Sequence, residues 1–600
     1  EDIIYTGKGN RYDPYDKFLK KPDVLVPKNF RFKVSERILV DGTIFKKINL
    51  ESIDPYLMFI DKHCIKSVAI VFLHSYKNSI HEDLLKNYLL KKRPDLHISV
   101  SSNISPVIGE FDRLNTTCSN AYIQPIAEKY LIELNHNLHE IGIDKFSLIW
   151  SDGGLSSLKE SILTPIRLLE SGPAGGALAV SSISRNSKNK NCIAFDMGGT
   201  TAKICLIKDQ KPKTSQVFEV ARSYRFKKGS GMPISIPVID MVEIGAGGGS
   251  LAHVDDLQQI RVGPQSASSN PGPACYDLGG IKPTVTDADL LLGKLSEEGF
   301  AGGSLLLNKS NSKKAINFKI GNKLSTAEKI AAHGISEVVD ENMANAARVH
   351  AVENGEDLSE YTMIAFGGAA PLHASRMCEK LGINTFLVPE RAGVGSALGF
   401  LNAPFSFQAN RSFYTVISSF NAKITKNIFK ELQKETTTFV KSCDPITPIQ
   451  SEFKLYMRYR GQGWEIPVIL TEKDAHNTSG KKLKKLFEKE YKKIFGRTVA
   501  DIDIEITIWS VNSFTTMKKI KEIRSLKQKK IIKSPMKRSI FDSNLGKTID
   551  AQIIQRHELN EGEKIIGPAI ISEDETTIIL TSNFTATLQS DKSIRVSTIK

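Results

Sequence analysis

The chain has 600 residues, of which 40% are hydrophobic, and it carries a formal net charge of +15 at pH 7. Since a single hydrophobic core stops growing at roughly 250 to 300 residues, this length predicts about three domains. No stretch approaches the roughly 20 uninterrupted apolar residues that a membrane helix needs, so we expect a soluble protein with no membrane partner.

The seven cysteines are scattered along the sequence and form no C-x-x-C pair. Because an odd number of scattered cysteines disfavours a closed disulfide framework, we expect a reducing, cytoplasmic location. The sequence starts at Glu1 with neither an initiator Met nor a signal-peptide pattern, and we expect that an upstream segment is missing.

Lysines gather in two places, residues 481–485 and residues 518–537. Neither run contains interleaved aromatic residues or a recognisable nucleic-acid-binding module. We therefore expect solvated surfaces and no nucleic-acid partner, with a basic nucleic-acid groove as the alternative.

The first predicted domain, residues 1–145, alternates strands and helices. The apolar run Ser67–Leu73 predicts a buried strand, His81–Lys92 an amphipathic helix and His97–Val100 a second strand. This alternation favours α/β layers.

A further helix is predicted from Pro125 to Ile141. Proline suits the first position of a helix, and apolar residues recur at every fourth place. These residues are Ile126, Tyr130, Leu134 and Leu138.

The second predicted domain, residues 146–400, has glycine clusters at the ends of apolar strands, where a backbone can approach a ligand closely. A long helix is predicted to begin at a capping box, Ser325–Glu328, and to stop at Gly355.

The third predicted domain, residues 401–600, is expected to be a separate α+β domain. In Ile502–Trp509, isoleucines alternate with polar residues, which predicts a strand with one buried face and one face in water. Thr576–Leu580 predicts another strand.

The segment Asn191–Ile207 predicts an apolar strand, a tight Gly-Gly turn and a second strand. Backbone N–H groups in such a turn bind anions, threonine hydroxyls can donate to phosphate, and an aspartate can hold magnesium. We interpret it as a phosphate-binding hairpin, with an ordinary hairpin turn as the alternative; no Walker loop occurs in the chain. The residues of this site are Asp196, Gly198, Gly199, Thr200 and Thr201.

The segment Tyr361–His373 predicts a strand, a second Gly-Gly turn and a helix that runs to about Leu381. Glycines there let the backbone lie flat against a base or ribose. Together the two segments resemble the phosphate and adenosine motifs of the superfamily of acetate and sugar kinases, heat-shock ATPases and actin. That resemblance implies ATP between two ribonuclease-H-like lobes.

Further glycine- and proline-rich strings narrow the resemblance to the hydantoinase A/5-oxoprolinase family. They stand in one order: Glu170–Gly176, Gly245–Ser250, Val262–Ser266, Pro271–Tyr276 and Pro283–Asp289. The resemblance covers most of the chain, from Phe72–Tyr76 to Met457–Gln462 and Gly567–Ile571.

The resemblance implies an α/β fold with ribonuclease-H-like, actin-like ATPase lobes and an additional α+β C-terminal domain. It implies ATP and Mg²⁺ as cofactors, with Asp196 as the metal ligand and a catalytic residue. Gly367, Gly368 and Ala369 would lie by the adenosine, and Gly247, Gly248 and Gly249 would line the same cleft.

Asp287 and Asp289 are candidate catalytic residues, with helix caps as the alternative. We expect Cys275, His74 and His373 to be core or turn residues rather than a nucleophile or ligands.

The activity that the resemblance implies is ATP-dependent hydrolysis of a cyclic amide of the hydantoin, N-methylhydantoin or 5-oxoproline type. ATP would phosphorylate the amide carbonyl oxygen and so make the bond open to water. The chain would be the A subunit beside a hydantoinase B-type partner. The alternatives are an acetone-carboxylase-like subunit and a nucleotide-binding regulatory subunit without catalysis.

In one respect the sequence departs from the family pattern. Family members carry a Gly-x-Asp-x-Gly-Gly-Thr-type phosphate segment near their start, and none precedes Asp196 here. We expect that this segment was lost upstream; supply by another chain and loss of ATP hydrolysis are the alternatives.

Overall fold

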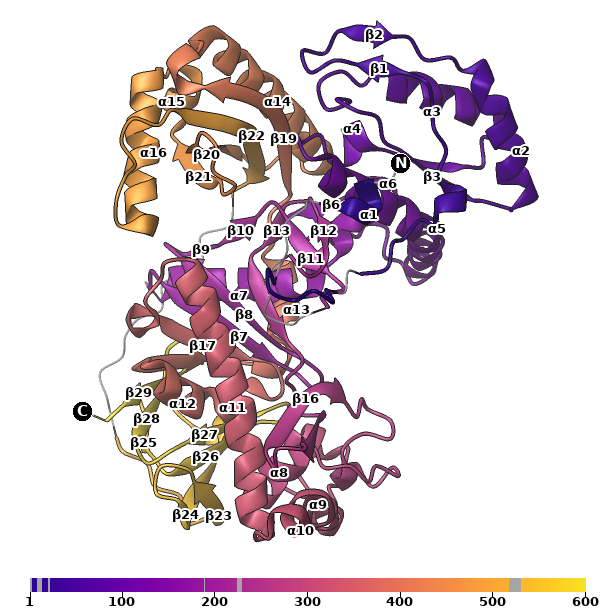
Figure 1. Cartoon of the computed structure of the whole chain (residues 1–600). Helices are drawn as coiled ribbons and strands as arrows, with labels where there is room; N and C mark the ends of the chain where they lie inside the picture. The colour runs from indigo at the N-terminus through magenta and orange to yellow at the C-terminus, as the bar shows by residue number, and fades with distance from the viewer. Residues whose placement is uncertain are drawn as a thin grey trace. The chain divides into compact units, whose positions relative to one another are not determined.

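The computed structural model describes residues 3–7, 13–19, 22–187, 189–223, 229–516 and 530–599. The chain forms two compact units, each assembled from three separate stretches (Figure 1). Unit 1 contains residues 1–171, 214–238 and 403–517, and unit 2 contains residues 172–213, 239–402 and 518–600. The predicted C-terminal range therefore contributes to both units, and the three domain boundaries stay predictions. Most of the second lysine run, residues 518–529, lies outside the described residues.

Unit 2 is built on a nine-stranded sheet with the order β14-β8-β7-β17-β18-β29-β28-β25, in which β9 also pairs with β8. β8 runs antiparallel to β7 and β14, whereas β17 runs parallel to β7 and β18. The central strands are apolar and buried on both faces, as expected for a sheet covered on both sides. The strands are β7 Cys192–Met197, β8 Ala202–Lys208, β9 Lys211–Pro212, β14 Met241–Ile244, β17 Thr362–Phe366, β18 Thr385–Val388, β25 Lys564–Ile566, β28 Phe584–Leu588 and β29 Ile594–Thr598.

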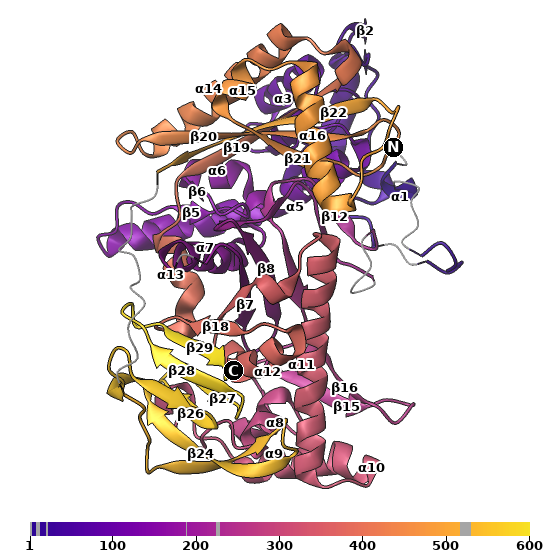
Figure 2. The same cartoon turned by 90° about the vertical axis from the view of Figure 1, so that its left-hand side faces the viewer.

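The strands at one end of this sheet, β29, β28 and β25, come from residues late in the sequence. β29 pairs antiparallel with β18, and β28 pairs with β29 (Figure 2). Beside it lies a four-stranded sheet of β23 Lys537–Asp542, β24 Lys547–Gln555, β26 Ala569–Ser572 and β27 Thr577–Leu580, which includes the strand predicted at 576–580.

Helices cover the large sheet. α12 packs on β7, β17 and β18, and α11 packs on α8, α12, β8 and β14; Figure 1 shows α11 as the long helix in front of these strands. The helices of unit 2 are α7 Ser171–Asn186, α8 Val285–Leu291, α9 Lys309–Ile316, α10 Asn322–Leu324, α11 Glu328–Glu353, α12 Ala370–Leu381 and α13 Gly395–Leu401.

The ends of α11 show one confirmed and one wrong prediction. The stop at Gly355 is confirmed: this glycine has φ +67°, its N–H donates to Val352 O at 3.0 Å, and the N–H of Glu356 donates to Ala351 O at 2.9 Å. This pattern is the Schellman motif. The predicted capping box is wrong, because Ser325 adopts φ +51° at the end of α10 and α11 begins without a side-chain cap.

The N-terminal part of unit 1 contains the parallel pair β3 Ser67–Ile70 and β4 His97–Val100, with helices α3 Ile80–Lys92 and α5 Glu110–Glu140. Both strands and the first helix were predicted. Shorter elements of this part are α1 Ile3–Thr6, β1 Arg37–Ile38, β2 Ile44–Lys46, α2 Asp54–Lys62, α4 Ser101–Ile104, β5 Leu148–Ile149, β6 Leu155–Ser156 and α6 Leu158–Leu163.

The predicted start of the second helix at Pro125 is wrong, because α5 begins at Glu110 and contains Pro125. Its first half is polar yet buried, and threonine hydroxyls there donate back to carbonyls one turn earlier, so no apolar period marks it. Of the apolar residues used for the prediction, Ile126 is 70% exposed and Tyr130 is 63% exposed.

A four-stranded antiparallel sheet forms the rest of unit 1, with the order β19-β22-β20-β21. α14 packs on β19 and β22, and α16 packs on β21. These elements are β19 Ser406–Val416, α14 Ala422–Cys443, β20 Ile449–Tyr459, β21 Ile466–Leu470, α15 Glu472–His476, α16 Gly480–Phe495 and β22 Ile504–Thr515.

The strand predicted at 502–509 is confirmed within β22, but the prediction that its polar face lies in water is wrong. β22 lies between two neighbours, and Glu505 on the polar side is only 3% exposed. Its carboxylate accepts a hydrogen bond from Arg458 Nε at 2.9 Å, which compensates its burial.

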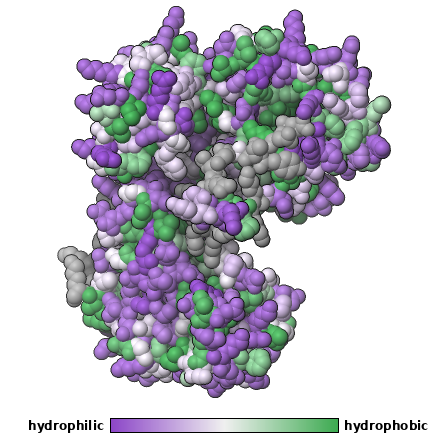
Figure 3. Space-filling model, in the orientation of Figure 1, coloured by the Kyte–Doolittle hydropathy of each residue, from purple (hydrophilic) through white to green (hydrophobic). Residues whose placement is uncertain are grey.

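The first lysine run confirms the expectation of a solvated face. On α16 the lysines at 481, 482, 484 and 485 are exposed, whereas Leu483 and Phe487 are buried. Hydrophilic and hydrophobic residues are mixed over the visible face of each unit (Figure 3). Within the described ranges, no helix is long and apolar enough to cross a membrane.

Candidate functional site

The predicted hairpin is present in unit 2. β7 and β8 pair from Cys192 opposite Ile207 to Met197 opposite Ala202, and the turn between them is closed by the N–H of Gly198, which donates to Thr201 O at 3.1 Å. Gly199 and Thr200 are exposed. A Cβ built at Gly198 or Gly199 would meet no atom within 4 Å, so the outer side of the turn is open space.

The loop 245–249, between β14 and β15 (Ser250–Val254), supports the hairpin turn from the other side. The N–H of Gly248 donates to Gly198 O at 3.1 Å, and the N–H of Gly249 donates to Gly199 O at 2.6 Å. A Cβ at Gly247 would lie 2.6 Å from the backbone N of Thr200, so only glycine fits there. The structure therefore brings the glycines at 247–249 together with Gly198 and Gly199, as the sequence analysis expected.

The second Gly-Gly turn follows β17 and lies beside the end of β7. Gly367 has φ +90°, and a Cβ there would lie 2.5 Å from Asp196 Oδ1. The N–H of Ala369 donates to Met197 O at 2.9 Å. A Cβ at Gly368 would meet only Glu575 O at 3.7 Å, so this glycine is open on its outer side.

Asp196 stands at the end of β7 between the two turns. Ser396 Oγ donates to its Oδ2 at 3.2 Å. Burial raises the pKa of this carboxyl, against the opposing effects of Lys203 and of the Ser396 hydrogen bond. A carboxylate that is half-buried and weakly compensated favours a bound cation.

Ser396 is a site residue that the sequence analysis missed. It lies in the first turn of α13. Glycines stand at 393, 395 and 399, so the sequence around Ser396 is rich in glycine like the two turns already identified. Gly395 in particular packs against Phe366, since a Cβ there would lie 3.0 Å from the Phe366 Cβ.

Asp287 is buried, and its carboxylate takes part in a helix cap. Its carboxylate accepts hydrogen bonds from the backbone N–H of Ala274, Cys275 and Thr284 and from the hydroxyls of Thr284 and Ser312, at 2.7 to 3.1 Å. It forms a capping box with Thr284 at the start of α8, which is the alternative left open by the sequence. Its link to the hairpin is indirect: the N–H of Thr286 donates to Gly248 O at 2.8 Å.

Asp289 is buried among charged groups. Its Oδ1 accepts a hydrogen bond from Lys294 Nζ at 2.8 Å, and its Oδ2 lies 3.3 Å from His373 Nε2. Burial alone would raise its pKa, but Lys294 and His373 lower it to about 2.

The three residues expected to be core or turn residues are so. His373 and Cys275 are fully buried, and His74 lies in a turn with φ +59°. Burial raises the pKa of the Cys275 thiol, which Asp287 raises further, so this cysteine is unreactive as a nucleophile.

Among the described residues, no group of three or more His, Cys, Asp or Glu side chains is arranged to hold a metal ion alone. A magnesium ion at this turn would therefore be held by Asp196 together with phosphate oxygens and water, as is usual for magnesium in nucleotide sites.

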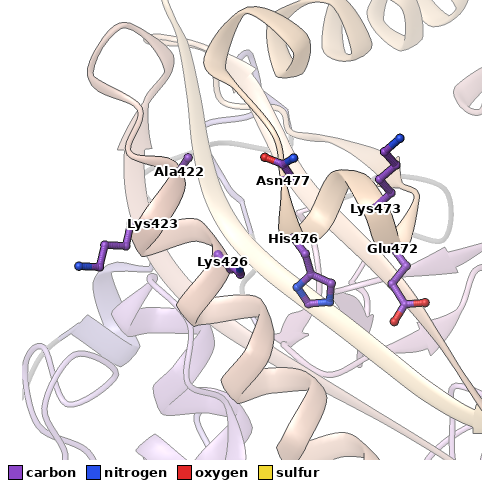
Figure 4. A pocket seen from close by; sticks show the side chains of 7 residues that line it. All are labelled: Ala422, Lys423, Lys426, Glu472, Lys473, His476 and Asn477. Atoms are coloured by element: carbon purple, nitrogen blue, oxygen red, sulfur yellow. The ribbon is translucent and has the colours of Figure 1, made fainter.

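A separate shallow pocket lies in unit 1 between α14 and α15. Its side chains do not converge: Lys423 and Lys473 extend away from each other, and the polar groups face different directions (Figure 4). It is lined by Ala422, Lys423, Lys426, Glu472, Lys473, His476 and Asn477. We do not assign it a function.

Family models for hydantoinase/oxoprolinase match nearly the whole chain. The hydantoinase/oxoprolinase model matches residues 113–409, its N-terminal region model residues 1–92 and its C-terminal domain model residues 417–597.

Two relatives match over almost the full chain. An uncharacterized protein of Methanocaldococcus jannaschii is 35% identical over 98% of this chain and 85% of the relative. The caprolactamase subunit alpha of Pseudomonas jessenii is 28% identical over 97% of this chain and 83% of the relative.

Two solved structures share the fold. The ATP-dependent caprolactamase from Pseudomonas jessenii matches with a TM-score of 0.86 and 26% identity, over 100% of this chain and 87% of the other. The nucleotide-free acetone carboxylase structure matches with a TM-score of 0.73 and 22% identity, over 97% of this chain and 83% of the other. At that identity the second match concerns the mixed α/β fold alone.

Proposed function

Since the chain belongs to the hydantoinase/oxoprolinase family, we propose that it is the ATP-binding subunit of an enzyme that hydrolyses a cyclic amide. The observation that carries the proposal is the hairpin turn at 198–201, which is open on its outer side and flanked by two glycine turns. The backbone N–H groups of an open glycine turn of this kind can bind the oxygens of a phosphate.

The topology of the large sheet supports a ribonuclease-H-like lobe of the actin-like type. β7, β8 and β14 form a run of three antiparallel strands, and β17 and β18 follow in parallel on the other side of β7. The hairpin between the first two strands and the turn after the fourth strand then meet at one edge, where we place the nucleotide.

The residues at this edge fit ATP and magnesium. The backbone N–H groups of the turn, with the hydroxyls of Thr200 and Thr201, would hold the phosphates. Asp196 would hold magnesium, whose charge offsets the cost of burying this carboxylate. The open outer side of Gly368 leaves room for the adenosine beside Gly367 and Ala369.

ATP bound there would supply a phosphoryl group to the amide carbonyl oxygen, which would make the carbonyl carbon open to attack by water. The backbone N–H groups and threonine hydroxyls of the turn would orient the phosphates, and Asp196 would hold the magnesium ion that offsets their charge. We assign Asp287 and Asp289 to the support of this edge through α8, because both carboxylates are already engaged.

The caprolactamase relatives support a cyclic amide as the substrate class, with a hydantoin, N-methylhydantoin or 5-oxoproline as the other rings to test. Because that relative is named as a subunit, we propose a B-type partner subunit for this chain as well. The seven cysteines are all free, which agrees with the proposed reducing cytoplasm.

A second candidate function is an ATP-dependent carboxylase subunit. Similarity in sequence to the acetone carboxylase beta subunit of Xanthobacter autotrophicus favours it over a regulatory role without catalysis. The same nucleotide site would then activate a carboxylation substrate instead of an amide.

Phosphate release by the chain in complex with its partner subunit tests the proposal. Caprolactam, 5-oxoproline, hydantoin and N-methylhydantoin are supplied in separate assays with ATP and magnesium, and acetone with bicarbonate forms a further arm. Release stimulated by a cyclic amide and abolished by Asp196→Asn supports the proposal. Release only with acetone and bicarbonate assigns the carboxylase function, and binding of ATP without release in any arm assigns the regulatory role.

A further inference from the structure

Two helices hold the two glycine segments at the hairpin turn. α8 contacts the loop 245–249 through the N–H of Thr286, which donates to Gly248 O. α12 begins immediately after the Gly367-Gly368 turn, whose following residue Ala369 donates to Met197 O. The relative position of α8 and α12 therefore helps to set the relative position of the two glycine segments, beside their direct hydrogen bonds to the hairpin.

A buried cluster of charged side chains joins these helices. His373 lies on α12. Its Nδ1 is 2.7 Å from Oδ1 of Asp340, and its Nε2 is 3.3 Å from Oδ2 of Asp289 on α8. Lys294 Nζ donates to Asp289 Oδ1 and to Ser336 Oγ, both at 2.8 Å. All five side chains are buried.

The charges in this cluster balance only when His373 is protonated, since two carboxylates then face one ammonium and one imidazolium. Burial alone would lower the pKa of His373, but Asp289 and Asp340 raise it to about 9. Other charged groups nearby belong to α11 and α12. Glu337 pairs with Arg376 at 2.8 Å and with Lys380 at 3.0 Å, and His333 lies close to Glu337 and Lys294.

We propose that His373 is a positioning residue for the nucleotide site, which acts by tying α12 to α8 through Asp289 and so fixes the two glycine segments against the hairpin turn. It does not touch the nucleotide. The inference rests on the proposed function, because the site that it positions is the ATP site assigned above. Neutralising His373 leaves two buried carboxylates facing a single lysine, and the loss of one partner of a buried ion pair destabilises the packing that the pair joins.

The test compares ATP affinity among full-length variants by calorimetry at pH 7 with magnesium present. His373→Asn can keep the hydrogen bond to Asp340 but loses the contact with Asp289. Arg376→Gln is the matched control, because Arg376 joins α12 to α11 through Glu337 and does not reach α8. We expect ATP to bind His373→Asn about tenfold more weakly, and Arg376→Gln within about twofold of the wild type.

The wild-type protein supplies a second readout that needs no variant. Its ATP affinity is measured from pH 7 to pH 10, with circular dichroism recorded on the same samples. We expect the affinity to fall as pH passes about 9 while the chain stays folded, and a soluble His373→Asn to lack this step. A merely structural role of His373 in overall stability would not produce that step.

The outcomes separate the two proposals. If the wild type binds ATP and His373→Asn binds it equally well, the positioning role is overturned and the nucleotide site stands. If His373→Asn does not fold, the wild-type pH titration decides: a flat affinity up to pH 10 overturns the role, and a fall near pH 9 supports it. If the wild type binds no ATP, both proposals fail together.

Discussion

The amide N–H of Gly249 donates to the carbonyl oxygen of Gly199 at 2.6 Å, so the hairpin turn is held by backbone contacts on its inner side. Side chains take no part in this contact, and the glycines are required because a Cβ at Gly247 would overlap the backbone of Thr200. The outer side of the same turn meets nothing. Substitutions on the two sides should therefore behave differently.

Gly199→Ala tests the open side. A Cβ there meets no protein atom, so we expect the free energy of unfolding to change by less than about 0.5 kcal/mol. ATP affinity should nevertheless fall about 5- to 150-fold, because overlap with a bound phosphate costs roughly 1–3 kcal/mol. Denaturant unfolding and ATP titration give the two quantities. Gly463→Ala, where a Cβ also meets no atom, is the control, and equal effects of the two variants would contradict the site.

Asp196→Asn tests the magnesium ligand. Because burial raises the pKa of Asp196, a neutral amide of the same shape should leave the unfolding free energy unchanged or raise it. Phosphate release should fall at least about a hundredfold, since the metal ligand is lost. The measurement is phosphate release over a magnesium titration, beside thermal unfolding. Full activity in this variant would remove Asp196 from the proposed site.

Asp287→Asn tests the helix cap. An amide has one acceptor oxygen where the carboxylate has two, and five donors converge on it. We expect the free energy of unfolding to fall by about 1–3 kcal/mol, measured in urea. Asp277→Asn, an exposed aspartate that accepts hydrogen bonds from Asn308 and Asn311, should change it by less than about 0.5 kcal/mol. Lost activity at unchanged stability would instead restore a catalytic role to Asp287.

The pKa of His373 predicts a pH dependence of stability. Its folded-state value is about 9 and its ordinary value is 6.5, so the folded state binds the proton more tightly. The resulting stabilisation is fully present below pH 6.5 and is lost as pH rises to about 9, a change of about 3 kcal/mol. Urea unfolding at pH 6, 7.5 and 9 measures it. His373→Asn should show a smaller slope over this range, and an unchanged slope would assign the effect to other groups.

The sequence predicted the strands and turns of the site well, because its signal there is local. The hairpin at 192–207 and the strand, turn and helix at 362–381 were expected within a few residues. Both depend on apolar strands that end at glycines, a pattern that a single stretch of sequence contains in full. What the sequence could not provide was the partner of each group, such as Ser396 for Asp196 or His373 for Asp289, because these pairs form across separate elements.

Two of the wrong predictions, the start of α5 and the polar face of β22 in water, share a physical cause, which is tertiary burial of polar residues. The start of α5 was missed because most of its buried side chains are polar, so they leave no apolar period; Thr116 and Thr117 donate to carbonyls one turn earlier, and Asn120 donates to Ser99. Glu505 was placed in water because its compensating Arg458 lies on another strand. In both cases the fold buries polar residues and supplies hydrogen-bond partners for them, which a local sequence pattern does not show.

The pairing of β18 with β29 has a consequence for synthesis on the ribosome. Phe386 pairs with Val596, and residues 403–517, which emerge between them, belong to the other unit. During translation the apolar edge of β18 therefore stays unpaired while residues 403–517 of unit 1 are synthesised. Exposed strand edges in nascent chains promote aggregation, so yield during expression should depend on chaperones that shield this edge until residue 598 has emerged.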